Sequence, residues 1–88
     1  MASNRQPVDG VAVDQAFGRV VRSLRKGADL SQESLGLASG NGRTFVSQLE
    51  RGERGASLKT LFRLADVLKT PPSEIVRQVE EELSHHAR

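Results

Sequence analysis

Helix-breaking residues divide this 88-residue chain into short segments, and this division limits what the chain can fold into. The breaks fall at Gly27, at Gly40-Asn41-Gly42, at Gly52 and at Pro71-Pro72. Between them, apolar residues recur every three or four positions, and no segment alternates apolar and polar side chains. The pattern therefore predicts an all-α domain of five short helices.

The two ends of the chain differ from its middle. Residues 1–12 hold a proline, a glycine and scattered polar groups without periodicity, which predicts a flexible arm. The helical pattern begins at Val13, where Asp14 is the candidate N-cap of the first helix. We therefore expect the ordered domain over residues 13–84 and a short tail over residues 85–88.

Serines and a proline mark where the later helices begin. Ser31 and Ser57 are suited to cap the second and fourth helices, because their hydroxyls can accept hydrogen bonds from free backbone N–H groups. Pro72 suits the first turn of the fifth helix, where its missing N–H has no partner to lose. The third helix is expected from Arg43 to about Arg51.

Composition excludes several classes of protein. Without cysteine there is no disulfide framework and no thiol nucleophile. No apolar run approaches the roughly 20 residues that span a bilayer, and no signal peptide is visible, so we expect a cytoplasmic protein. No nucleophile–base pair or phosphate-binding glycine loop is evident, which argues against an enzyme, a cofactor or a small-molecule ligand. His85 and His86 lack a third ligand, so no metal site is expected.

The formal charge of +2 conceals two regions of opposite sign. From Phe17 to Arg63 there are nine Lys and Arg against four Asp and Glu. From Glu74 onward, four Glu face two Arg. A basic middle and an acidic end predict that the middle of the chain faces a nucleic acid.

The segment from Ser31 to Gly52 has the plan of a helix-turn-helix, with two short helices around a tight glycine turn. Four polar residues of its second helix share one face, since their spacing is i, i+3, i+4 and i+7: Thr44, Ser47, Gln48 and Arg51. Arg43 lies at the N-terminal end of that helix. Such side chains are suited to hydrogen bonds with base edges and phosphates.

Over most of its length the chain resembles the phage-repressor (XRE or Cro-type) helix-turn-helix family. The matching pieces, at their usual mutual spacings, are SQESL, RTFVSQLERG and SLKTLFRLADVL. RTFVSQLERGERG resembles in particular the controller proteins of restriction–modification systems. The resemblance implies a five-helix repressor-like fold and a transcriptional regulator that binds double-stranded DNA sequence-specifically. It also implies a bacterial or phage-derived, nucleoid-associated protein.

The resemblance and the polar face together suggest how DNA is contacted. The candidate base contacts are Arg43, Thr44, Phe45, Ser47 and Gln48. The candidate phosphate contacts are Ser31, Gln32, Arg51, Arg54 and Lys59. Phe45 has two interpretations, because it can pack on the core or contact a thymine methyl group. Ser31 is likewise both a helix cap and a candidate phosphate contact.

The resemblance also implies an ion pair across the core between Arg25 and Glu50, so neither is expected to contact DNA. Three positions depart from the family pattern, namely Gly36, Asn41 and Gly42. Glycine at 36 costs about 1 kcal/mol of helix propensity, and Gly42 removes the usual side-chain cap. These positions are expected to weaken the turn locally.

A dimer is expected because the core is lean and the last helix carries an apolar stripe. The candidate dimer-interface residues are Val76, Val79 and Leu83. Two recognition helices of a homodimer would read a palindromic operator. The alternative is a protein–protein interaction module on the same scaffold, antitoxin-like or anti-activator. Leu37 favours this alternative, because it stands where the family usually has a polar residue.

Overall fold

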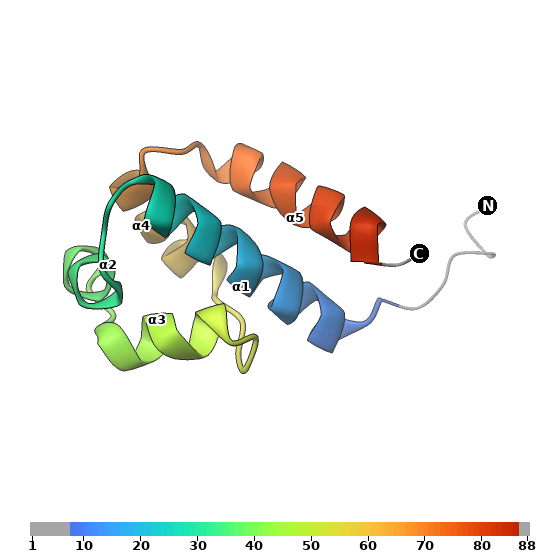
Figure 1. The fold of residues 1–88 in the computed structure, drawn as a ribbon, viewed down its shortest axis with the longest axis horizontal. Helices are drawn as coiled ribbons and strands as arrows, with labels where there is room; N and C mark the ends of the chain where they lie inside the picture. The colour runs from blue at the N-terminus through green and yellow to red at the C-terminus, as the bar shows by residue number, and fades with distance from the viewer. Residues whose placement is uncertain (1–7, 87–88) are drawn as a thin grey trace.

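Five helices form most of residues 8–86, the part of the chain that the computed structural model describes (Figure 1). They are α1 (Gly10–Gly27), α2 (Gln32–Ser39), α3 (Arg43–Glu50), α4 (Leu58–Leu68) and α5 (Pro72–His86). Residues 8–86 contain no strand, and the predicted all-α, five-helix fold is confirmed. Most of the predicted arm, residues 1–7, and the end of the predicted tail, residues 87–88, lie outside the described residues.

The first helix begins three residues earlier than the sequence predicts. Asp9 is its N-cap, and the Asp9 carboxylate accepts hydrogen bonds from the backbone N–H of Val11 at 3.0 Å and of Ala12 at 3.2 Å. Asp14 lies inside the helix, so its assignment as the cap is wrong. Residues 10–12, which the sequence assigns to the flexible arm, belong to the first turn of this helix.

The other helix starts agree with the sequence. The Ser31 hydroxyl accepts from the backbone N–H of Ser34 at 2.9 Å, and the Ser57 hydroxyl accepts from that of Thr60 at 3.1 Å. α5 begins at Pro72, as predicted. These starts were predictable because a cap depends on residues within one helical turn.

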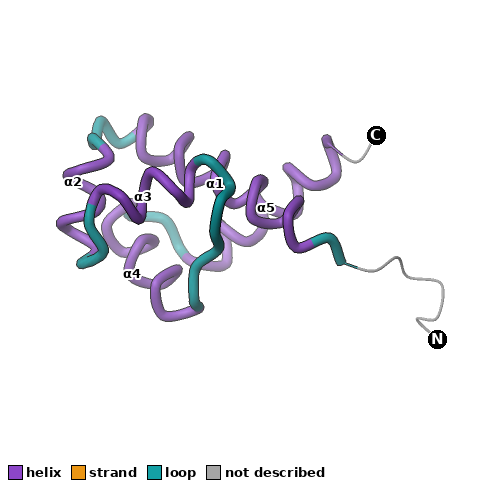
Figure 2. Tube along the Cα trace, turned by 90° about the horizontal axis from the view of Figure 1, so that it is seen from below, coloured by secondary structure: helices purple, strands orange, loops and turns teal. Residues whose placement is uncertain are grey.

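α1 is the central helix, packed against α5 on one side and against α3 on the other (Figure 1). α2 packs against both α3 and α4. The larger buried cluster joins α1 to the next three helices through Val21, Leu35, Val46, Leu49, Leu64 and Leu68. A smaller cluster holds α5 through Val20, Ala65 and Ile75. Figure 2 shows α3 between two loops, the turn after α2 and the longer connection to α4.

The turn between α2 and α3 presses directly on Gly36. A Cβ at position 36 would lie 2.3 Å from the carbonyl carbon of Gly42. The Gly36 carbonyl accepts hydrogen bonds from the backbone N–H of Asn41 at 2.9 Å and of Gly42 at 3.0 Å. The Asn41 side chain donates to the carbonyl of Ser39 at 3.0 Å. The three residues that depart from the family pattern thus form one close contact, in which glycine at 36 makes room for the turn.

We predict that Gly36→Ala destabilises the protein by about 1–3 kcal/mol, because the added methyl group must displace the backbone of the turn. Alanine's better helix propensity offsets only part of this loss. Urea denaturation measures the effect. Gly27→Ala is the matched control, since a Cβ there would meet nothing within 4 Å. Equal stability of the two variants would contradict the prediction.

Candidate nucleic-acid interface

α3 is held by two buried side chains and presents its polar residues on the other side. Val46 and Leu49 are fully buried in the larger cluster. Arg43 and Thr44 are exposed, and within the described part of the chain their side chains make no hydrogen bond or ion pair. The first turn of α3 therefore offers a cation and a hydroxyl that are available to a ligand.

Phe45 is half-buried and packs against the larger cluster, which agrees with the first of its two interpretations, packing on the core. The Arg54 guanidinium lies over the ring, with its Cζ 4.4 Å from the ring centroid. Arg54 Nη1 also donates to Gln48 Oε1 at 3.3 Å. Two of the candidate base-contact residues are thus joined by a cation from the loop after α3.

Arg51 forms an ion pair with Glu53 and a hydrogen bond with Ser47. Arg51 Nε lies 2.7 Å from Glu53 Oε2, and Arg51 Nη2 lies 3.1 Å from Glu53 Oε1. Arg51 Nη1 donates to the Ser47 hydroxyl. The hydrogen bonds between Arg51 and Glu53 lower the pKa of the Glu53 carboxyl and raise the pKa of Arg51. A phosphate would have to replace Glu53 as the partner of Arg51.

The structure brings Arg25 and Glu50 together. Arg25 Nε lies 2.6 Å from Glu50 Oε2, and Nη2 lies 3.0 Å from Oε1. The two side chains are 11% and 3% exposed. Arg25 Nη1 also donates to the carbonyl of Leu30 at 2.8 Å. The hydrogen bond to Glu50 raises the pKa of Arg25, so Arg25 stays protonated.

Gln32 belongs to this charge pair. Its Nε2 donates to Glu50 Oε1 at 3.0 Å, and its side chain is half-buried. The sequence predicts that Gln32 contacts a phosphate, but in the structure its side-chain amide donates a hydrogen bond to the buried Glu50 carboxylate. At the N-terminus of α2, the groups suited to bind an anion are the backbone N–H groups next to the exposed cap Ser31.

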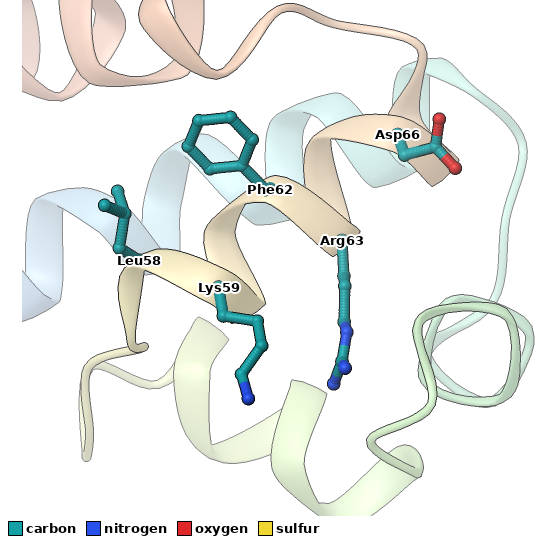
Figure 3. A pocket seen from close by; sticks show the side chains of 5 residues that line it. All are labelled: Leu58, Lys59, Phe62, Arg63 and Asp66. Carbon is teal, nitrogen blue, oxygen red and sulfur yellow. The ribbon is translucent and has the colours of Figure 1, made fainter.

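α4 carries an apolar face and a basic face. Figure 3 shows Lys59 and Arg63 pointing to the side where α3 lies, and Leu58 and Phe62 pointing to the opposite side. Arg63, which sequence reasoning missed, is exposed and makes no ion pair with any residue of the described range 8–86. The i, i+4 spacing from Lys59 was a signal that could have identified it.

The apolar residues expected at a dimer interface have different surroundings. Val76 is 48% exposed, whereas Val79 packs against the smaller buried cluster and Leu83 is half-buried. The sequence did not identify Leu58 and Phe62, which are 70% and 54% exposed. Leu58, Val76 and Val79 nevertheless line one apolar groove, where α1, α4 and α5 meet.

No group of three His, Cys, Asp or Glu side chains that could hold a metal ion is found among the described residues. The side chain of His86, half of the histidine pair noted in the sequence, lies outside what the structure describes. None of the helices between residues 8 and 86 is long and apolar enough to cross a membrane.

The fold and the polar face of α3 define a helix-turn-helix protein, and comparison with known proteins agrees. The chain belongs to the helix-turn-helix family, whose model matches residues 21–75. This is a family of transcriptional regulators and not of enzymes.

Among curated proteins, the chain is 46% identical to the control protein C.SmaI of Serratia marcescens over 67 residues, 75% of this chain and 80% of that protein. It is 37% identical to C.MunI of a Mycoplasma species, over 75% of this chain and 90% of that protein.

Among solved structures, the restriction-modification controller protein C.AhdI of Aeromonas hydrophila matches with a TM-score of 0.68 at 40% identity. The match covers 70% of this chain and 94% of that one. The clp gene regulator ClgR of Corynebacterium glutamicum has a TM-score of 0.82 over 94% of this chain and 84% of its own. At 22% identity ClgR shows the shared fold alone.

We predict that Glu50→Ala costs about 3–5 kcal/mol of stability, because it leaves Arg25 buried without its partner. DNA binding should be lost only because the protein unfolds. Thermal denaturation measures the effect, and Glu80→Ala is the control, since Glu80 is exposed on α5. An unchanged melting temperature for Glu50→Ala would show that the pair does not hold the fold.

Proposed function

We propose that this protein is a sequence-specific transcriptional regulator that binds a palindromic operator as a homodimer. The observation that carries the proposal is the arrangement of α3. Two buried side chains, Val46 and Leu49, fix the helix, and Arg43 and Thr44 project from its first turn without partners in the described chain. A recognition helix contacts base edges with residues of this end.

The residues of α3 divide into base and phosphate contacts by their chemistry. Arg43 reads guanine, and Thr44, Phe45, Ser47 and Gln48 line the same groove. The surrounding cations bind phosphates and make the affinity depend on salt. These phosphate contacts are Lys59, Arg63, Arg51 once released from Glu53, and the N-terminus of α2 at Ser31 and Gln32.

We further propose that a second copy of the chain covers the apolar side of α4 and the start of α5. Leu58, Phe62 and Val76 are exposed there, and burying such side chains drives association. α1 separates α5 from α3, so this interface leaves the polar face of α3 open (Figure 1). Two copies would place their recognition helices in successive major grooves, about 34–36 Å apart.

The relatives support this function. C.SmaI and C.MunI are control proteins, and C.AhdI is a restriction-modification controller. We infer that this chain likewise controls transcription, and that dimerisation couples its concentration to DNA binding. A cytoplasmic, nucleoid-associated location would follow from this role.

Leu37 supports the alternative function of a protein–protein module. It is 73% exposed on α2 and lines a groove with Ala38, Arg63 and Val67. That function predicts a partner protein on α2 and α3 and no salt-sensitive affinity for DNA, so a salt titration of DNA binding distinguishes the two.

For DNA binding, we predict that Arg43→Ala and Gln48→Ala each weaken operator binding by about 1–3 kcal/mol and relax the preference at one base pair. The operator is first selected from random DNA with purified protein. Binding is then measured by gel shift at several salt concentrations. Arg77→Ala, which removes the same charge from α5, should leave affinity nearly unchanged. Unaltered operator affinity in both α3 variants would refute the assignment of α3 as the recognition helix.

For the dimer, we predict that Phe62→Glu weakens self-association by roughly tenfold or more, since a buried aromatic anchor contributes about 2 kcal/mol or more to an interface. Sedimentation equilibrium measures the association, and circular dichroism confirms folding. Leu37→Glu is the matched control, because it places the same charge at an exposed apolar site on α2. A Phe62→Glu protein that dimerises like wild type would exclude this interface.

A further inference from the structure

The loop after α3 is anchored on α1 at two glycines. A Cβ at Gly52, whose φ is +72°, would lie 2.8 Å from Cγ of Gln15. A Cβ at Gly55 would lie 2.7 Å from Oδ1 of Asp14. The Gly52 backbone therefore sits directly against the backbone of α1, whereas Gly55 lies against the Asp14 side chain. Glu53 and Arg54, the two residues between these glycines, make the hydrogen bonds that join the loop to α3.

The anchored loop is also tied to α3 by hydrogen bonds. The backbone N–H of Glu53 donates to the carbonyl of Gln48 at 3.0 Å. The Arg54 side chain then returns over α3, with its guanidinium above the Phe45 ring at 4.4 Å and Nη1 donating to Gln48 Oε1 at 3.3 Å. A cation stacked on an aromatic face and bonded to an amide oxygen has a defined orientation, and so do its two partners.

We propose that Arg54 is a positioning residue that sets the base preference of Gln48, in place of the phosphate contact expected from the sequence. This inference rests on the proposed DNA-binding function. Arg54 occupies one lone pair of the Gln48 amide oxygen, so any base that bonds to this oxygen must share it with Arg54, whereas both donors of the Gln48 NH₂ group stay available. An NH₂ group donates to O6 and N7 of guanine or to O4 of thymine. The two-bond contact with adenine also needs the amide oxygen, so it is disfavoured.

The first test compares base preferences, measured by sequencing DNA selected by each purified variant. We expect Gln48 to face a guanine or a thymine. Arg54→Ala and Gln48→Ala should relax the same base position, each with roughly tenfold weaker operator binding. The double variant should be no weaker than Gln48→Ala alone, because the two side chains act as one unit. Arg54→Lys, which keeps the charge but lacks the planar guanidinium, should relax the same position.

Lys59→Ala is the matched control for charge. It should weaken all sequences equally and reduce the salt dependence by about one phosphate contact. If Arg54→Ala behaves in the same way, Arg54 contacts a phosphate and the proposal is wrong. It is also wrong if Arg54→Ala relaxes a base position that Gln48→Ala leaves unchanged, or if Gln48 selects adenine.

The second test uses the free protein and does not depend on DNA. In the NMR spectrum, side-chain protons of Arg54 should be shifted by the Phe45 ring current. Phe45→Leu should abolish the shift, and Arg54→Ala should move the side-chain amide signals of Gln48. Unshifted Arg54 signals together with intact operator binding would overturn the positioning role alone. Shifted signals in a protein that binds no DNA would instead overturn the proposed function.

Discussion

The buried ion pair between Arg25 and Glu50 is the interaction on which the helix-turn-helix depends. It joins the end of α1 to the end of α3, and Gln32 adds the start of α2 to the same carboxylate. Apolar packing alone is tolerant of small rotations, whereas a two-bond charge pair has one geometry. The pair therefore restricts the orientation of α3 relative to α1 and, with it, the direction in which the polar face of α3 points.

A central α1 explains how one small domain carries two separate surfaces. α3 packs on one side of α1 and α5 on the other (Figure 1), while α4 turns its cations toward α3 and its apolar residues away (Figure 3). On α4 the two kinds of side chain are neighbours, because Lys59 and Arg63 line the same pocket as Leu58 and Phe62. The separation holds for α3 and α5, since α1 lies between them.

Much of the site was predictable from the sequence, and its gaps have physical causes. The polar face of α3 follows from helical spacing, and the caps Ser31 and Ser57 follow from interactions within one turn. The engagement of Gln32 by Glu50 could not be predicted, because the two residues are 18 positions apart. Nor could the loop's return over Phe45, since it depends on the anchoring of Gly52 against α1.

By itself the sequence determined the five helices, their breaks and the residue types on the outer side of α3. These are set by local propensity, capping and periodicity, which act over a few residues. Only the tertiary structure decided which apolar side chains stay exposed and that Gln32 hydrogen-bonds to Glu50. Those outcomes depend on contacts between residues far apart in the chain, and Gly36 shows the difference. The sequence indicates a lower helix propensity at this position and room for a close helix approach, whereas the fold shows that the backbone of the turn at Gly42 occupies that room.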